Sequence, residues 1–267
     1  VDLVSMKAWT YPADGSGKVK EAPVPSNMES AVTTAREALI EMVAEADDAL
    51  MEKFFDAGTL TQEELLSGLK RGIGAARIFP VVCSSATANI GLQPLMDAIV
   101  SYVPTPAERG VAVTDAKTGT EARADSSDSG PVGAFIWKTV ADPFAGRITL
   151  FRVISGTLKA DSTVYNVTRD VPERLGSLIL LQGKTQTSVP EIKAGDLGAV
   201  AKLKESLTSD LLADKSYAFR ATPIKFPEAV ISYAIEPKSR GDEEKISTAL
   251  HRLQEEDPTL SYNRDAQ

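Results

Sequence analysis

Cys83 and His251 are the only cysteine and the only histidine in this chain of 267 residues, and they are the first candidates for chemistry. A cysteine nucleophile needs a general base within hydrogen-bond reach, and a Cys/His zinc site needs about four such ligands. His251 lies in a different segment, and Cys83 ends the apolar run 78–83, which predicts a short buried strand. The sequence therefore predicts a packing cysteine, no catalytic residue and no metal site. A hydrolase built on Cys83 is the weakest functional hypothesis.

Two motifs that bind nucleoside triphosphates are absent from the sequence. It contains no Gly-x-x-x-x-Gly-Lys-Ser/Thr loop, which holds phosphates through its amides and lysine, and no Asn-Lys-x-Asp sequence, which reads the base. Phosphoryl transfer depends on positioning the phosphates and a Mg²⁺ ion. We therefore expect that this polypeptide by itself does not hydrolyse GTP.

Five carboxylates follow one another along a helix predicted over residues 29–57. Ser26 and Glu29 form a capping-box pattern at its start, and Gly58 supplies a left-handed stop at its end. The carboxylates recur three or four residues apart and are named here the acidic ridge: Glu37, Glu41, Glu45, Asp48 and Glu52. Like charges at these spacings each cost about 0.2–0.5 kcal/mol. The acidic ridge is either a solvated face that keeps the protein soluble or a docking surface for a basic partner.

The elements that position these residues fall into three segments of different charge. Counted from the sequence, residues 1–106 carry net −6, residues 107–223 net +1 and residues 224–267 net −3, which together give the overall −8. The first segment predicts helices, including one after a second capping box at Thr61–Glu64, and then the strand 78–83. A helix over 92–103 follows, with Leu95, Met96, Ile99 and Val100 pointing inward. The middle segment predicts six to eight short strands that close into a barrel. They include strands over 133–140 and 147–155, with a turn over 142–146 between them. The last predicts a strand over 226–237 and a helix that begins at Asp242. The fold class is therefore multi-domain α+β.

Composition narrows the setting in which the protein works. With 43% hydrophobic and 25% charged residues, the chain is typical of soluble globular proteins. It contains no apolar run of about 18 residues and no secretory leader, so we expect a cytoplasmic protein with no membrane contact. The first residue is valine, and we expect that the chain begins partway through a longer protein.

The loop after the predicted strand carries a family resemblance. VVCSSATANIGLQPLMDAIVSYVPTP resembles the last guanine-recognition element of elongation factor G, and VDLVSMKAW resembles the start of that factor's helical insert in the GTPase domain. The resemblance implies that Ser85 and Ala86 are the pair whose backbone amides read the guanine carbonyl oxygen. It also implies that the acidic ridge contacts the flexible stalk protein of the large ribosomal subunit. GTP and Mg²⁺ would be cofactors of the full-length parent, with none held by this chain.

The middle and last segments extend the resemblance. DPFAGRITLFRVISGTLKADSTVYN and EIKAGDLGAVAKL resemble the β-barrel domain II of translational GTPases, and residues from 226 onward resemble the opening of domain III, a partial ferredoxin-like βα segment. Related barrels lean on rRNA, which five basic side chains would contact: Arg147, Arg152, Arg169, Arg174 and Lys184. Because net +1 is low for a nucleic-acid binder, scattered surface bases are the alternative. The incomplete last segment is expected to dock on the barrel or to self-associate.

The sequence is consistent with two functions. The first is a fragment of an elongation factor G-like ribosome-binding GTPase that promotes translocation. The second is a non-catalytic module that docks on a ribosome or a basic protein and comes from a divergent paralogue. Departures from the family pattern, such as Lys202-Leu203 in place of Gly-Leu, leave open whether the parent is the housekeeping translocase.

Overall fold

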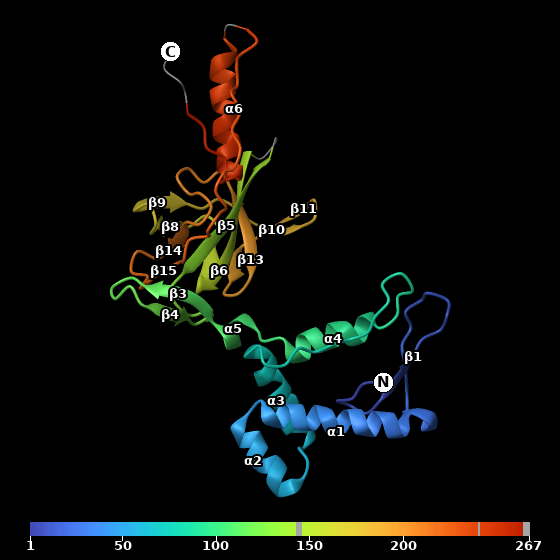
Figure 1. The fold of residues 1–267 in the computed structure, drawn as a ribbon. Coiled ribbons are helices and arrows are strands. Elements are labelled where there is room, and N and C mark those ends of the chain that lie inside the picture. The colour runs from blue at the N-terminus through green and yellow to red at the C-terminus, as the bar shows by residue number, and fades with distance from the viewer. Residues whose placement is uncertain (143–145, 240, 264–267) are drawn as a thin grey trace. The chain divides into compact units, whose positions relative to one another are not determined.

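The computed structural model describes residues 1–142, 146–239 and 241–263. The chain divides into two compact units, Val1–Thr105 and Pro106–Gln267, which are described separately below. Figure 1 shows helices throughout the first unit and a large sheet in the second. Within the described ranges, no helix is both long enough and apolar enough to cross a membrane.

The first unit is a small helical assembly with one hairpin. Its elements are β1 (Ala8–Thr10), β2 (Lys20–Ala22), the 3-10 helix η1 (Ser26–Met28), α1 (Glu29–Glu45), α2 (Asp48–Ala57), α3 (Gln62–Gly74) and α4 (Leu92–Tyr102). Val43, Leu50 and Leu65 lie at the centre of its core. Gly68 on α3 permits the close packing, because a Cβ there would lie 2.5 Å from the side chains of both Leu50 and Val43.

The predicted single helix over 29–57 is wrong, because two helices occupy that range. Asp47 adopts an extended backbone, and its carboxylate accepts hydrogen bonds from the amides of Ala49 (3.1 Å) and Leu50 (3.2 Å). An Asp side chain that caps the amides offers the backbone an alternative to helix continuation. The predicted capping box at Ser26 is also absent, since α1 begins after η1 without a side-chain cap. The box at Thr61 and Glu64 is confirmed, as is the left-handed stop at Gly58.

The predicted buried strand over 78–83 does not form. These residues have no regular secondary structure, and Phe79 is 75% exposed and Val81 90% exposed. A strand of this kind needs neighbouring strands, and the described part of the first unit pairs strands only in the β1–β2 hairpin.

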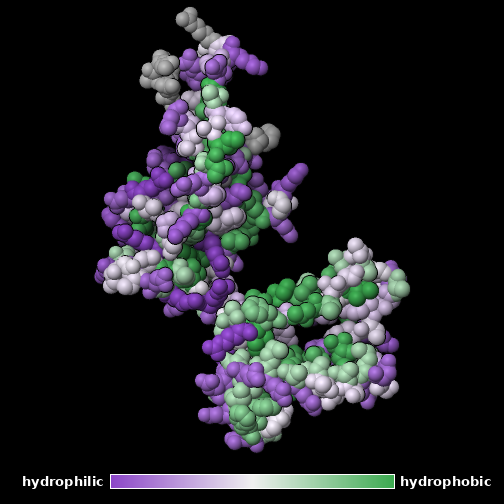
Figure 2. All heavy atoms as spheres, in the orientation of Figure 1, coloured by the Kyte–Doolittle hydropathy of each residue, from purple (hydrophilic) through white to green (hydrophobic). Residues whose placement is uncertain are grey.

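The helix predicted after that segment is confirmed as α4. Its apolar residues Met96, Ile99 and Val100 are largely exposed, although the sequence pattern predicted that they point inward. Figure 2 shows hydrophobic residues gathered on the surface over this helix.

The second unit is an antiparallel β-structure with a short helix before it and a longer one after it. The helices are α5 (Pro106–Arg109) and α6 (Asp242–Glu256). The strands are β3 (Val111–Asp115), β4 (Glu121–Ala124), β5 (Gly133–Asp142), β6 (Gly146–Ser155), β7 (Thr157–Lys159), β8 (Thr163–Asn166), β9 (Val171–Arg174), β10 (Leu178–Gln182), β11 (Thr185–Val189), β12 (Glu191–Lys193), β13 (Leu197–Ala201), β14 (Leu211–Ala213) and β15 (Phe219–Arg220).

These strands enclose two apolar clusters. The main sheet has the order β11-β10-β13-β6-β5-β14-β8-β9, and a two-stranded sheet, β12-β7, and a three-stranded sheet, β15-β3-β4, complete the second unit. Ile136, Phe151, Val153 and Leu212 are fully buried in the larger cluster. The prediction of an α+β protein with a large antiparallel, barrel-type sheet is confirmed. The turn expected between β5 and β6, at residues 143–145, lies outside the described residues.

Strands β5 and β6 form the longest hairpin of the sheet, and it contains a β-bulge. Ile136 pairs with Phe151 and Lys138 pairs with Leu150, so Trp137 has no partner in the ladder. An extra residue of this kind bends the strand and redirects its side chain. Trp137 is 38% exposed, whereas the neighbouring Ile136 is fully buried.

The last segment departs from prediction in one respect. Residues 226–237 form no strand, and Val230 is 98% exposed. The described residues place no strand beside them, which removes the pairing that a strand requires. The predicted helix forms as α6 from Asp242, but none of its residues is buried.

Candidate functional site

The loop between residues 84 and 91 is closed by a pair of backbone hydrogen bonds. Ser85 donates to the carbonyl of Ile90 (2.8 Å), and Ile90 donates back to the carbonyl of Ser85 (3.0 Å). Asn89 and Gly91 both have positive φ, 54° and 74°. A Cβ at Gly91 would lie 2.7 Å from the carbonyl oxygen of Cys83, so only glycine fits this turn without a shift. The loop is therefore an ordered turn, held by backbone hydrogen bonds and by a requirement for glycine at position 91.

The two residues predicted to read guanine differ in what their amides do. The Ser85 amide is used inside the loop, whereas the Ala86 amide has no acceptor among the residues that the structure describes. Ala86 is exposed and Ser85 is half-buried. The geometry thus leaves one amide of the pair, that of Ala86, open to an outside acceptor.

A second turn of the first unit supports this loop. The Asn89 side chain donates to the carbonyl of Gly15 (3.4 Å). A Cβ at Gly17, which has φ 68°, would lie 2.4 Å from the Asn89 amide nitrogen. The turn between β1 and β2 therefore packs closely on the loop, and sequence reasoning gave no signal of this contact because it joins residues more than 70 positions apart.

The acidic ridge is divided between two helices. Glu37, Glu41 and Glu45 lie on α1, and Asp48 and Glu52 lie on α2 beyond the break at Asp47. All five are exposed, and none forms an ion pair within the described ranges. The ridge is therefore a set of unneutralised surface carboxylates on two helices, instead of one continuous face.

The five basic residues proposed for the barrel do not form one class. Arg147 is only 14% exposed and is held by Glu255 and by the carbonyls of Leu203 and Lys204. Arg169 donates to the buried carboxylate of Asp210 (2.5 Å). The remaining three are exposed: Arg152 on β6, Arg174 at the end of β9 and Lys184 in the β10–β11 turn. Arg147 and Arg169 are thus held by internal contacts, whereas the other three side chains are exposed and form no ion pair with the described residues.

The barrel also contains a buried polar network that sequence reasoning missed. Glu173 is 3% exposed and accepts from the amides of Glu205 (2.7 Å) and Ser206 (2.9 Å) and from the Ser206 hydroxyl (2.9 Å). Asn166, fully buried, donates to Ser206 Oγ (2.9 Å) and to Asp210 (3.0 Å). The sequence offered one signal for this network. Asn166 on β8 and Glu173 on β9 are polar residues at inward-facing positions of short strands. The network fixes the turn 202–210 against β8 and β9.

Cys83 lies in the first unit and His251 in the second. Cys83 is exposed, so the prediction of a packing cysteine is wrong, and the reason is that the strand it would end does not form. His251 is an exposed residue of α6 whose Nδ1 lies 3.8 Å from Glu255. Among the described residues, no group of three or more His, Cys, Asp or Glu side chains has the geometry of a metal site.

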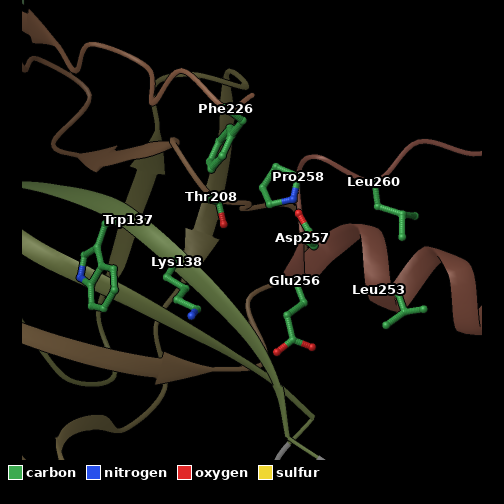
Figure 3. Close-up of a pocket in the computed structure, with 9 residues that line it drawn as sticks. All are labelled: Trp137, Lys138, Thr208, Phe226, Leu253, Glu256, Asp257, Pro258 and Leu260. Carbon is green, nitrogen blue, oxygen red and sulfur yellow. The ribbon is translucent and has the colours of Figure 1, made fainter. Parts of the chain in front are cut away.

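A groove of about 580 Å³ lies between β5 and the end of α6. Figure 3 shows Trp137 and Lys138 on β5, with Leu253 and Glu256 on α6. The aromatic ring of Phe226 adds to its apolar lining. The groove therefore combines apolar and charged side chains from two parts of the second unit.

One group in this groove has a shifted pKa. The hydroxyl of Thr259, followed by its amide, donates hydrogen bonds to Asp257 and lowers the pKa of that carboxyl. Such bonds belong to the turn that follows α6, and they keep the carboxylate ionised. A general base needs a pKa nearer the working pH, so Asp257 is unsuited to proton transfer. The groove is better suited to contact than to catalysis.

Two family models match parts of the second unit. The family model described as "Elongation factor G domain 2" matches residues 131–215, and "Elongation Factor G, domain III" matches residues 226–267. A crystal structure of a protein from Thermus thermophilus superimposes with a TM-score of 0.79 and 27% sequence identity over 100% of this chain. This chain spans 37% of the length of that Thermus chain.

Proposed function

We propose that this chain, which belongs to the elongation factor G-like translational GTPases, supplies the ribosome-contacting part of such a factor and leaves GTP hydrolysis to other residues. The observation that carries the proposal is the order of parts along one chain. A loop with an open amide at Ala86 comes first, and the matches to domains II and III follow it. The protein would work in the cytoplasm, on the ribosome.

In this proposal Ser85 and Ala86 complete a guanine site only together with the parent's phosphate-binding residues. The open amide of Ala86 suits a guanine carbonyl oxygen, which is a hydrogen-bond acceptor. The chain contains no sequence motif that would hold the triphosphate or its Mg²⁺ ion. GTP and Mg²⁺ are therefore assigned to the full-length parent, and this chain is proposed not to hydrolyse GTP alone.

Two surfaces would make the ribosome contacts. The acidic ridge would bind a basic face of the stalk protein, because unpaired exposed carboxylates attract and orient a positively charged partner. Arg152, Arg174 and Lys184 would contact rRNA phosphates on the barrel. Figure 2 shows hydrophilic residues over much of the barrel surface that faces the viewer. Arg147 and Arg169 are left out of this proposal because internal partners hold them.

Co-sedimentation of the purified chain with ribosomes tests the proposal. We expect the wild type to pellet with ribosomes at low salt, and we expect Glu41→Lys/Glu45→Lys to lower its affinity at least several-fold. Asp56→Lys/Glu63→Lys is the matched control, because both residues are exposed, lie in the same unit and lie outside the acidic ridge. Failure of the wild type to bind, or an equal loss in both double variants, would contradict the proposal.

The barrel surface is tested in the same assay. Arg152→Glu/Arg174→Glu should weaken pelleting and reduce its salt dependence, since fewer phosphate contacts release fewer counterions. Lys159→Glu/Lys193→Glu makes the same change of charge at exposed residues of β7 and β12 and is the control. An unchanged salt slope in the first variant would exclude those arginines from the rRNA contact.

A further inference from the structure

One ion pair joins the last segment of the chain to the barrel. Arg147 on β6 donates to Glu255 near the end of α6 at 2.5 Å. The two side chains are 14% and 23% exposed, so both charges are largely withdrawn from water. Within the described residues, this is the ion pair that connects α6 to a strand of the sheet.

The Arg147 guanidinium has acceptors other than Glu255. It also donates to the backbone carbonyls of Leu203 and Lys204, the latter at 2.7 Å. Three acceptors from two parts of the chain therefore hold the same planar group. The barrel therefore presents an oriented guanidinium, and Glu255 is one of its three acceptors.

The apolar contact that accompanies this pair is small. No residue of α6 is buried, and Leu253, which lines the groove, is 50% exposed. Trp137 reaches the groove from the bulge in β5, and Phe226 reaches it from the segment that leads to α6 (Figure 3). Because little apolar surface is buried, hydrophobic burial alone holds α6 weakly. A partly buried ion pair therefore carries a large share of the attachment.

We propose that the Arg147–Glu255 pair is a releasable latch between domain II and the first helix of domain III, and that the groove beside Trp137 opens when the latch breaks. Release frees α6 without disturbing the strands, because Arg147 belongs to β6 and α6 is joined to the sheet through residues 221–238, which have no regular structure. The latch does not depend on the ribosome-binding proposal and is tested without ribosomes.

Other titratable and charged side chains lie near the Glu255 carboxylate. His251 Nδ1 lies 3.8 Å from the same carboxylate oxygen that Arg147 contacts. Lys138 on β5 and Glu256 and Asp257 at the end of α6 line the adjacent groove. Glu256 carries the same charge one residue further along the helix without joining the Arg147 pair, which makes it the natural control.

The test measures the distance between the helix and the barrel in the full chain. Spin labels are placed at Ser247→Cys on α6 and Lys159→Cys on β7, both exposed, after Cys83→Ser removes the native thiol. We expect one narrow distance distribution in this background and in Glu256→Gln. Glu255→Gln should add a broad second population, raised at least several-fold over the background, and Glu255→Arg should make it dominant.

Trp137 gives an independent readout. In a Trp9→Phe background it is the only tryptophan, and Glu255→Gln should shift its emission to the red as the groove gains water. Circular dichroism and urea unfolding of the barrel should be unchanged, because Glu255 lies outside the sheet. The latch is contradicted by a distance distribution that stays narrow in Glu255→Gln, by equal broadening in Glu256→Gln, or by a broad distribution in the unmodified background.

Discussion

The carboxylate of Glu173 accepts both the backbone amide and the hydroxyl of Ser206, each at 2.9 Å, in the interior of the barrel. Both residues are buried, at 3% and 0% exposure. A buried charge persists in a protein only when hydrogen bonds replace its water. The turn that returns the chain from β13 to β14 is therefore held by a side chain from β9.

Replacing Glu173 should destabilise the barrel strongly. Glu173→Ala leaves buried donors at Glu205 and Ser206 without acceptors, and we expect a loss of about 3 kcal/mol in the free energy of unfolding. Urea unfolding followed by Trp137 fluorescence in a Trp9→Phe background measures the loss. Glu191→Ala on β12, which is exposed, should change it by less than about 0.5 kcal/mol. An equal loss of unfolding free energy in Glu173→Ala and Glu191→Ala would show that the buried network does not stabilise the barrel.

The break between α1 and α2 should depend on the Asp47 side chain. Asp47→Ala removes the cap of α2 and the ion pair with Arg71 (2.8 Å), and we expect a clearly lower urea midpoint for the first unit. Asp47→Asn keeps a capping oxygen and should lower the midpoint less. Urea unfolding followed by Trp9 in a Trp137→Phe background reports on this unit. An unchanged urea midpoint in Asp47→Ala would mean that side-chain packing alone determines the break between α1 and α2.

The capping box of α3 makes stability depend on pH. The Lys53 ammonium (2.6 Å), followed by the amide and hydroxyl of Thr61, lowers the pKa of Glu64 to about 2 from its ordinary 4.5. A carboxyl whose pKa is lower in the folded state contributes stability that is present above pH 4.5 and is lost as the pH falls towards 2. We therefore expect the first unit to lose stability in that window.

Glu64→Gln isolates this contribution from the other carboxylates. The difference in unfolding midpoint between wild type and Glu64→Gln should be constant above about pH 5 and should shrink towards zero near about pH 2. Nuclear magnetic resonance titration of the Glu64 carboxyl carbon gives the pKa directly. A midpoint difference that does not change with pH would contradict the assignment.

The sequence correctly predicted those structural features that depend on interactions between neighbouring residues. The alternation in residues 133–140 and 147–155 predicted strands, and the Thr61–Glu64 pattern predicted the start of α3, because neighbouring residues decide both. Short strands such as β7, β12 and β14 were missed. Each is three residues long and depends on a partner far away in the sequence, which no local pattern contains.

The failed predictions have a common physical cause. Apolar residues at 78–83 and 226–237 carry the pattern of strands, yet no described strand pairs with either segment. The pattern shows which side chains of a segment are apolar enough to be buried. It does not show whether another strand is present to pair with that segment. At the candidate site, sequence identified the loop at Ser85 and Ala86 by resemblance. It did not show that only Ala86 keeps an open amide, because that depends on the bond between Ser85 and Ile90.

The absence of a strand at 78–83 makes Cys83 accessible to reagents. Because Cys83 is exposed, we expect the native protein to react with an uncharged thiol reagent at the rate of a small free thiol. Urea should not accelerate the reaction. A slow native reaction that speeds up on unfolding would show that the residue is buried, as the apolar run first indicated.

Equilibrium binding of a fluorescent GTP analogue to the isolated chain, with Mg²⁺ present, tests the central claim most directly. The claim is that the chain holds one guanine-contacting loop and the domains beyond it, without the residues that grip the triphosphate. We predict no saturable binding at micromolar protein and no hydrolysis. Saturable, Mg²⁺-dependent binding that GTP displaces and ATP does not would contradict the account.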